Sequence, residues 1–356
     1  MESQKTLNKK QVNTALCSIG MSGVVFHAPF IINHPGYHLY AVWERTKNIA
    51  TEKYPQAKQY RHLDEMLKDD SIDLVVVNTP NITHYKYAKK ALNAGKHVII
   101  EKPFAPSTAN CEELITLAKE KNKILTVYHN RRYDSDFLAM KNVLDQKLIG
   151  EIREAEFHYD RFDDNLSYKL HKEINEKGTG CLYDLGSHLI DQALVLFGWP
   201  EYVFADIFSM RPVSKVDDYF EVLLYYKGFR VRLKASYQVR ESIPAFVLHG
   251  NKGSFIKYRS DVQEKNLLLG RMPDEKDWGT EFETSAGILN TEINGVLIRK
   301  KVLSPQGNYM NYYDTLYKSI CNNEPLPVTA EQGMDVIKII EAAIKSSEEK
   351  IVIKLI

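Results

Sequence analysis

A lysine follows a short apolar run in the segment VIIEKPFAPS, at a position where chemistry is common. The run predicts a buried strand, and parallel sheets bind ligands at the carboxyl ends of their strands. Pro103 ends the strand and restricts Lys102 to extended backbone geometry, and the bond between them can be cis. Lys102 is therefore a candidate to stabilise a negatively charged oxygen. The plainer alternative is a solvated strand end.

An aspartate and a histidine stand four residues apart in GTGCLYDLGSHLIDQALVLFG. A helix here puts Asp184 and His188 on one face, and Asp191 extends the same stripe. Imidazole titrates near neutral pH, so His188 is a candidate proton carrier, and Asp184 can orient a substrate or hold the imidazole. Gly186 costs a helix about 1 kcal/mol relative to alanine. The close approach of another group, such as a nicotinamide ring, would explain it.

Two other interpretations of this helix stay open. The stripe could be only a polar face at a domain boundary. Asp184, His188 and Asp191 could also bind a metal ion, but the sequence offers no clear further ligands, so we expect no metal.

Together, the lysine and the histidine suit the dehydrogenation of a secondary alcohol. That reaction needs a hydride acceptor, which a nicotinamide supplies, and a base for the hydroxyl proton. His188 would be the acid–base group. Lys102 would stabilise the developing oxyanion and relay the proton.

The segment SIGMSG, residues 18–23, stands where a strand runs into a helix. Dinucleotide-binding folds place G-x-G-x-x-G at such a joint, and Ser18 replaces the first glycine here. Gly20 would let the backbone approach a pyrophosphate, and Gly23 would let the helix pack on the strand. Amides at the helix N-terminus favour phosphate, and the Ser18 hydroxyl can support the turn. The alternative is an ordinary strand–helix connection.

An acidic residue closes the second predicted strand, a little over twenty residues after Gly20. At this distance an acidic side chain meets the ribose hydroxyls of a dinucleotide. Glu44 therefore modestly favours NAD over NADP, since its charge would repel a 2′-phosphate. Arg45 could instead bind that phosphate or stack on the adenine.

Apolar runs alternate with helical segments over the first 130 residues and predict a doubly wound parallel sheet. Helices are expected over 83–95, ending in a C-cap glycine, and from the N-cap Thr108 onward. After residue 130 a helix is expected over 136–146. Longer alternating strands follow, with hairpin turns at YYKGFR and GNKGSF. An amphipathic helix over 329–348, capped by Thr329 with Glu331 close behind, ends the chain.

Composition limits the class of protein. The 356 residues suit two domains, and 47 basic residues nearly balance 46 acidic ones. We therefore expect a small-molecule partner, with no nucleic acid and no membrane. The four cysteines are scattered and the N-terminus lacks the apolar core of a signal peptide, which predicts a cytoplasmic protein.

These motifs resemble the Gfo/Idh/MocA oxidoreductases, NAD(P)-dependent dehydrogenases of sugars, inositols and related polyols. EKP closes a strand, and YDLGSHLIDQ follows about eighty residues later. GMSGVVFHAPF, YHNRRYDSDF and GSFIKY resemble the subgroup that contains scyllo-inositol dehydrogenases. The resemblance implies an α/β protein with an N-terminal Rossmann domain, residues 1–129, and a C-terminal α+β domain, residues 130–356. The second domain would carry a large open antiparallel sheet, and its face would make homodimers or homotetramers.

The resemblance also implies site residues. The catalytic residues would be Lys102, Asp184 and His188. Cofactor binding would involve Ser18, Gly20, Met21, Ser22, Gly23, Glu44, Arg45, Thr79, Pro80, Asn81, His84, Glu101, Lys102 and Asn130. Substrate contacts would come from Lys102, Tyr128, Arg131, Arg132, Arg161, Tyr183, Asp184 and His188.

Three functions stay open at this stage. The first is an NAD(P)-dependent polyol or sugar dehydrogenase, favoured because the chain retains Lys102, Asp184 and His188 together. The second is a non-catalytic dinucleotide or sugar sensor on the same fold. The third is a reductase of a conjugated substrate, for which the charged segments HNRRYD and DRFDDN suit the cleft poorly.

Overall fold

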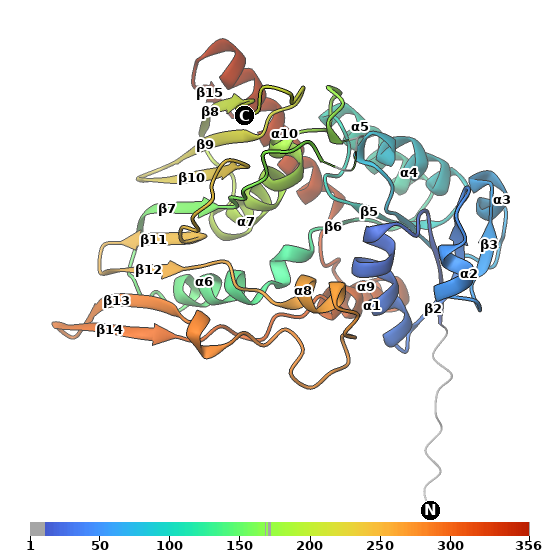
Figure 1. The fold of residues 1–356 in the computed structure, drawn as a ribbon, viewed down its shortest axis with the longest axis horizontal. Helices are drawn as coiled ribbons and strands as arrows, with labels where there is room; N and C mark the ends of the chain where they lie inside the picture. Colours follow the sequence, from blue (N-terminus) through green and yellow to red (C-terminus); the bar gives the residue numbers. More distant parts are fainter. Residues whose placement is uncertain (1–10, 168, 170–171, 356) are drawn as a thin grey trace, which may run out of the picture.

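The computed structural model describes residues 11–167, 169 and 172–355; residues 1–10, part of the N-terminal segment in which we expect no signal peptide, lie outside that description. The first half forms a six-stranded sheet in the order β3-β2-β1-β4-β5-β6 (Figure 1). All its paired strands run parallel, in the order of dinucleotide-binding sheets, so the expected parallel sheet is confirmed. The strands are β1 (Val12–Leu16), β2 (Tyr37–Trp43), β3 (Lys58–Tyr60), β4 (Leu74–Val77), β5 (His97–Glu101) and β6 (Leu125–Tyr128).

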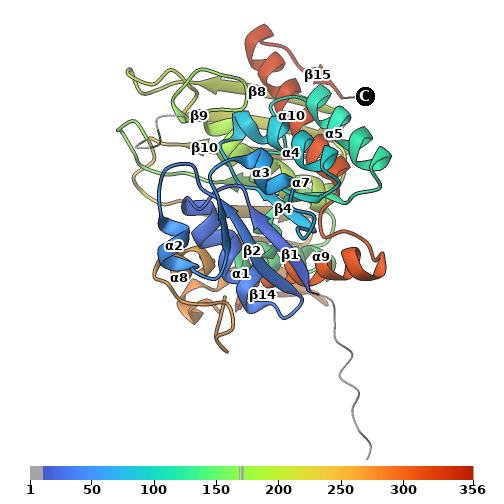
Figure 2. The ribbon, with the colours of Figure 1, turned by 90° about the vertical axis from the view of Figure 1, so that its right-hand side faces the viewer.

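Helices flank this sheet (Figure 2). They are η1 (Gly23–His27), α1 (Ala28–Asn33), α2 (Ile49–Lys53), α3 (Leu63–Leu67), η2 (Asn81–Thr83), α4 (His84–Asn93) and α5 (Thr108–Glu120). The N-cap of α5 is Ser107, whose hydroxyl accepts from the Asn110 amide at 3.3 Å. The expected N-cap Thr108 is therefore wrong by one residue, because its hydroxyl instead donates to Glu341 at 2.6 Å.

A nine-stranded sheet forms the second half, in the order β14-β13-β12-β11-β7-β10-β9-β8-β15. Its strands are β7 (Ile152–His158), β8 (Tyr202–Phe208), β9 (Tyr219–Tyr226), β10 (Phe229–Ser236), β11 (Phe246–Gly250), β12 (Gly253–Lys257), β13 (Gly287–Ile293), β14 (Val296–Val302) and β15 (Ile353–Lys354). Both expected hairpins, β9–β10 and β11–β12, are present.

The second sheet is mainly antiparallel, as we expected, and contains one parallel pair. The pair β7–β10 is parallel and the other neighbouring pairs are antiparallel. A parallel pair needs a long crossover connection, and a long segment with a helix separates β7 from the strands beyond it. Strand β7 therefore enters the middle of the sheet, between two hairpins.

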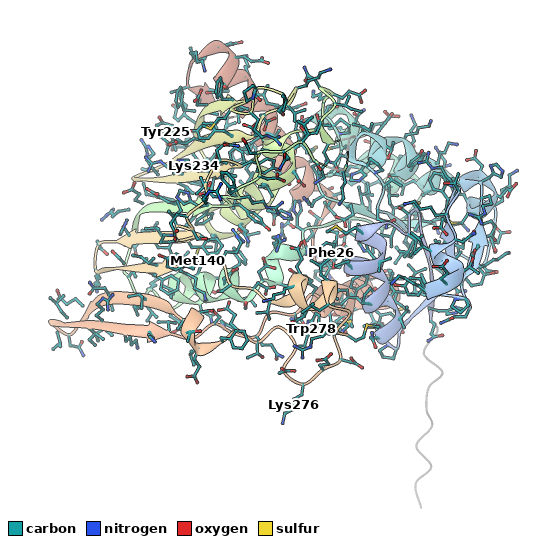
Figure 3. All side chains as sticks on the ribbon, in the orientation of Figure 1. Phe26, Met140, Tyr225, Lys234, Lys276 and Trp278 are labelled. Carbon is teal, nitrogen blue, oxygen red and sulfur yellow. The ribbon has the colours of Figure 1, made fainter. Side chains whose placement is uncertain are left out.

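The second half of the chain also contains helices, some beside the nine-stranded sheet and others, near the label α1, beside the first half (Figure 1). They are η3 (Asn130–Tyr133), α6 (Ser135–Asp145), η5 (Leu182–Gly186), α7 (Ser187–Phe197), α8 (Gln263–Leu268), η6 (Glu283–Ser285), α9 (Met310–Asn322) and α10 (Ala330–Glu349). Side chains of β9 alternate between buried and half-buried, so Tyr225 and, on β10, Lys234 belong to the face turned away from the helices (Figure 3).

Helix α9 returns to the first half and packs against its parallel sheet. The ring of Tyr313 stacks on Phe30 with centroids 5.7 Å apart, and its hydroxyl lies 2.7 Å from His27 Nδ1. Helix α10 begins at the expected N-cap Thr329, in a capping box whose partner is Gln332 rather than Glu331. The two halves are thus joined by helices from the end of the chain. Of the helices in the described ranges, none has the length and apolar character that crossing a membrane requires.

Candidate active site

A cavity of about 840 Å³ opens between the carboxyl ends of β1, β4 and β5 and the segment that leads into η5. It brings together most of the residues expected from the sequence. These are Ser18, Gly20, Met21, Ser22, Thr79, Pro80, Asn81, Glu101, Lys102, Tyr128, Asn130, Arg131, Arg161, Asp184 and His188. Gly23, Glu44, Arg45, His84, Arg132 and Tyr183 are not among the lining residues.

The serine that replaces the first glycine supports the turn, as we expected. The hydroxyl of Ser18 accepts a hydrogen bond from the Gly20 amide at 3.2 Å, and its carbonyl accepts one from Asn78 Nδ2 at 2.8 Å. A Cβ at Gly23 would collide with that carbonyl and lie 2.9 Å from Asn78 Nδ2. A Cβ at Gly20 would meet only the Ser18 hydroxyl, at 3.5 Å. Gly23 therefore permits close packing, and Gly20 leaves an open surface toward the cavity.

The helix that carries Asp184 and His188 begins with a π-helical turn, η5, and so does the helix after the glycine turn, with η1. Such turns are frequent at functional sites. The extra residue in a π-helical turn changes the direction in which the neighbouring side chains point. Gly186 does not line the cavity. A Cβ there would lie 2.8 Å from Leu182 Cδ1 and 3.2 Å from the Phe220 ring. Packing against β9, rather than the nicotinamide we expected, explains this glycine.

Lys102 and Asp184 meet inside the cavity, from opposite halves of the chain. The ammonium of Lys102 donates to Asp184 Oδ1 and to the Asp184 carbonyl, both at 2.8 Å. Lys172 donates to Asp184 Oδ2 at 2.6 Å. Burial alone would raise the pKa of Asp184, but the charges of Lys102 and Lys172 lower it well below its usual range. The Lys102–Pro103 peptide bond is cis.

His188 lies one helical turn from Asp184 and is buried. Burial lowers the pKa of its imidazole well below the usual range, and the nearby charges of Lys102 and Arg131 lower it further. The ring is therefore neutral at neutral pH and can accept a proton. Its centroid lies 6.3 Å from that of Tyr159, which also lines the cavity.

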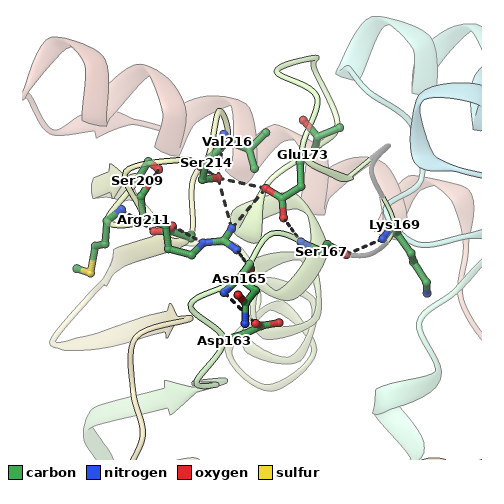
Figure 4. A network of polar contacts seen from close by, with 12 residues as sticks. Asp163, Asn165, Ser167, Lys169, Glu173, Ser209, Arg211, Ser214 and Val216 are labelled. Carbon is green, nitrogen blue, oxygen red and sulfur yellow. Dashed lines mark hydrogen bonds and ion pairs between the residues drawn. The ribbon is translucent and has the colours of Figure 1, made fainter.

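The segment that carries Lys172 is anchored by a polar network around Arg211 (Figure 4). Arg211 donates to the Asn165 carbonyl at 2.5 Å and pairs with Asp218 at 2.8 Å. Glu173 accepts from the Ser167 amide at 2.8 Å and lies 3.5 Å from Arg211. The network holds Asn165 and Ser167, which precede Lys172, and Glu173, which follows it. It therefore fixes the part of the cavity wall from which Lys172 reaches Asp184.

Asp191, the third residue of the expected helix stripe, does not line the cavity. Its two oxygens accept from Arg132 Nε and Nη2 at 2.9 and 2.6 Å. Arg131 is also paired, with Asp134 at 3.1 Å and Glu264 at 2.5 Å. Two of the three arginines expected to contact substrate are thus held by carboxylates of the protein.

Glu101 links the glycine turn to the strand that ends at Lys102. Its carboxylate accepts from the Ser22 hydroxyl, and the same oxygen lies 3.0 Å from His27 Nε2. Burial alone would raise the pKa of Glu101, but the hydrogen bonds and charge of its partners, His27 first, lower it to about 2. The carboxylate is thus charged, and one of its oxygens is held by both the Ser22 hydroxyl and the His27 ring.

The ring of His84 connects the segment after β4 to the segment that carries Lys102. The ring of His84 lies between two carbonyl oxygens, 2.8 Å from that of Pro103 and 2.9 Å from that of Thr79. Asn81 Nδ2 donates to the Gly178 carbonyl at 3.0 Å. His84 therefore ties the segment at Thr79 to the one at Lys102 without reaching the cavity itself.

Glu44 points away from the cavity. Its carboxylate accepts from the backbone amides of Ile49 and Ala50, at 3.0 and 3.2 Å, and so caps α2. Arg45 is exposed, and Lys47 lines the cavity. Arg61 holds this turn by donating to the carbonyls of Glu44 and Lys47, at 3.0 and 2.6 Å.

Both tyrosines expected at the site use their hydroxyls as donors to backbone carbonyls. The hydroxyl of Tyr128 donates to the Phe26 carbonyl and that of Tyr183 to the Pro106 carbonyl, each at 3.0 Å. Among the lining residues that sequence reasoning missed are Asn78, Tyr159, Lys172 and Glu264. Asn78 directly follows the predicted third strand, so its position at a strand end was an available signal. The other three lie in segments without a motif.

Comparison with known proteins relates the whole described fold to one group of enzymes. Residues 12–129 match the oxidoreductase family with an NAD-binding Rossmann fold, and residues 141–355 match its C-terminal alpha/beta domain. The chain is 36% identical to scyllo-inositol 2-dehydrogenase (NADP(+)) IolW of Bacillus subtilis, covering 97% of this chain and 96% of that protein. It is 21% identical to D-glucoside 3-dehydrogenase of Escherichia coli, covering 97% and 98%. A crystal structure of a Bacteroides fragilis protein described as an oxidoreductase is 45% identical, with a TM-score of 0.89 and coverage of 97% and 100%.

Replacing Gly23 or Gly20 by alanine should show which of the two glycines is required for packing of the turn. Gly23→Ala forces the Ser18 carbonyl to move, and we expect it to lower the free energy of unfolding by about 1–3 kcal/mol. Gly20→Ala should change it by at most about 1 kcal/mol, because its Cβ makes only an ordinary contact with the Ser18 hydroxyl and alanine stiffens the unfolded chain. Urea denaturation of both variants measures this. Equal losses in the two would contradict the packing argument.

Acid should reveal the contribution of Glu101. Its pKa in the folded state is depressed from 4.5 to about 2, so the stabilisation is complete above pH 4.5 and is lost as the pH falls toward 2. Glu101→Gln should lower the free energy of unfolding at neutral pH by about 3 kcal/mol and flatten its pH dependence over that window. The exposed Glu112→Gln is the control for removing one carboxylate. An unchanged acid profile in Glu101→Gln would refute this assignment.

Proposed function

Because the chain belongs to the Gfo/Idh/MocA oxidoreductase family, we propose that it transfers a hydride between a nicotinamide cofactor and the secondary alcohol of a sugar, inositol or related polyol. One observation carries the proposal. Lys102, Asp184 and His188 come from both halves of the chain and line one cavity with the glycine turn. That combination supplies a cation, a carboxylate and a neutral imidazole beside a dinucleotide-binding edge.

The residues at the turn fit a dinucleotide. A Cβ at Gly20 would contact only the Ser18 hydroxyl, and Gly20 lines the cavity at a strand–helix joint, where helix amides favour phosphate. Ser18, Met21 and Ser22 would border the phosphates, and Thr79, Pro80, Asn81 and Asn130 would border the nicotinamide half. Glu101 and His84 would hold these segments in position. A bound nicotinamide would supply the hydride acceptor.

The protein's own groups divide the remaining work. The alcohol loses a hydride from carbon and a proton from oxygen, and becomes a carbonyl. His188 is neutral, so it can take the hydroxyl proton. The Lys102 ammonium can donate a hydrogen bond to the oxygen as negative charge develops there. Asp184 positions the ammonium and can accept from a neighbouring substrate hydroxyl.

The cofactor is NADP in this proposal. The reason for expecting NAD was the Glu44 carboxylate, and that group caps α2. Arg45 and Lys47 follow it, in a turn held by Arg61, with Lys47 lining the cavity. Two cations near the ribose suit a 2′-phosphate. The relative IolW is named as an NADP(+) enzyme, which supports the same choice.

Three coarser assignments accompany the reaction. Residues 1–129 would act as the dinucleotide-binding domain and residues 130–356 as the substrate domain. The open face of the nine-stranded sheet, with Tyr225 and Lys234, would join copies into a homodimer or homotetramer. Four free cysteines fit a reducing cytoplasm.

Removal of either proposed catalytic side chain should abolish turnover but leave cofactor binding intact. Lys102→Ala and His188→Ala should each lower kcat on a polyol substrate by about 10²–10⁴-fold, the usual contribution of a positioned acid–base or oxyanion group. Turnover is followed by nicotinamide absorbance, and binding by quenching of tryptophan fluorescence. Lys89→Ala, on α4 and outside the cavity lining, is the matched control. Near-normal turnover in both variants would reject the catalytic assignment.

Cofactor choice can be measured without any substrate. Wild-type protein should bind NADPH at least about tenfold more tightly than NADH, the effect of one charge-assisted contact. The double variant Arg45→Gln, Lys47→Gln should lose that preference and keep its affinity for NADH. Lys53→Gln, exposed on α2, is the control. Tighter binding of NADH by the wild type would overturn the choice of NADP.

A further inference from the structure

We expected three arginines near the substrate, Arg131, Arg132 and Arg161, and they have different partners in the structure. Arg132 is bound through two nitrogens to Asp191 and through Nη1 to Gln332 at 3.0 Å, outside the cavity. Arg131 faces the cavity, but Asp134 and Glu264 both pair with it. Neither has a guanidinium left for an anionic ligand.

Arg161 lines the cavity and pairs with no carboxylate among the described residues. Its guanidinium lies 5.2 Å from the centroid of the Tyr159 ring, and Arg259 lies 3.9 Å from the same centroid. The backbone of Arg161 is fixed by a hydrogen bond from its amide to the Ser236 carbonyl, at 2.8 Å, and by one from the Val239 amide, at 3.0 Å. A cation is therefore held by its backbone and an aromatic ring at the cavity wall.

The acidic side chains closest in sequence to Arg161 are engaged elsewhere. Asp163 also lines the cavity, and its carboxylate accepts from the Asn165 amide at 3.2 Å. Asp160 accepts from the Ser236 amide at 3.0 Å. Neither compensates the guanidinium by direct contact.

Two cations next to the proposed carbinol position share one carboxylate. Lys102 and Lys172 share the single carboxylate of Asp184, at 2.8 and 2.6 Å. Arg161 adds a third cation to this part of the cavity. Burial alone would lower the pKa of Arg161, but Tyr159 and the charge of Asp184 raise it, which indicates that this guanidinium lies within electrostatic range of the Lys102–Asp184 pair.

We propose that the substrate is an anionic polyol, a uronate or an aldonate, whose carboxylate binds Arg161 while its carbinol lies between Lys102 and His188. This inference rests on the proposed function and names its substrate class. A guanidinium binds a carboxylate through two parallel hydrogen bonds, which suits a fixed arginine without a carboxylate partner. The bound carboxylate supplies the negative charge that Lys102, Lys172 and Arg161 together lack.

Paired substrates test the class. Wild-type protein is assayed with glucuronate and gluconate, and with their neutral counterparts glucose and scyllo-inositol, following nicotinamide absorbance. We expect kcat/KM to favour the acids by about 10- to 100-fold, the usual effect of one charge-assisted contact. Arg161→Gln should reduce this ratio by about the same factor, and Arg161→Lys should restore part of it. Arg153→Gln, an exposed arginine of β7, is the matched control and should leave the ratio unchanged.

A second measurement separates this inference from the proposed function. Titration calorimetry of gluconate into protein saturated with NADPH should detect binding in the wild type and weaker binding in Arg161→Gln. Absence of turnover on every polyol, with gluconate binding that depends on Arg161, would refute the dehydrogenase assignment and leave the anion site standing. Equal kcat/KM for acids and neutral polyols in the wild type, or equal losses on both in Arg161→Gln, would overturn the anionic substrate.

Discussion

An ammonium and a carboxylate from opposite halves of the chain meet at 2.8 Å, and the rest of the cavity depends on that contact. Lys102 directly follows β5 of the parallel sheet, and Asp184 lies in η5, which packs on the nine-stranded sheet. A half-buried ion pair tolerates little displacement, because either partner left alone keeps part of the cost of desolvation. The two halves must therefore be held in one orientation. Helix α9 does this by packing Tyr313 against Phe30, and α10 does it by packing against both halves.

The two segments that approach the Lys102–Asp184 contact have the same local structure. Each begins its helix with a π-helical turn, η1 after Gly20 and η5 around Asp184. A wider turn redirects the first side chains of a helix, so that Ser22 faces Glu101 and Asp184 faces Lys102. Long-range bonds then fix each turn, from Asn78 to the Ser18 carbonyl and from Lys102 to the Asp184 carbonyl.

Sequence alone predicts the features of this site that are local. The glycine turn, the lysine before a proline and the Asp-x-x-x-His spacing each need only a few neighbouring residues, and all three line the cavity as expected, apart from Gly23 itself. Pairings between distant segments could not be predicted. Asp191 reaches Arg132 across 59 positions, and Glu44 turns toward the amides that follow it. Lys172 lies in a segment without periodicity, and β3, β8, β13 and α9 lack a clear pattern, so tertiary contacts decide them.

The same set of charges gives the lysine and the histidine opposite protonation states. Asp184 stays ionised beside Lys102 and Lys172, and its carboxylate accepts a hydrogen bond from the Lys102 ammonium at 2.8 Å. The ammonium, with Arg131 and with burial, in turn keeps His188 neutral. A hydrogen-bond donor to a developing oxyanion must be charged, and a proton acceptor must not be. One fixed carboxylate between two lysines satisfies both requirements, and an imidazole in direct contact with that carboxylate would lose the second. The separation of His188 from Asp184 by one helical turn, rather than a hydrogen bond between them, is therefore what makes the pair useful for opposite roles.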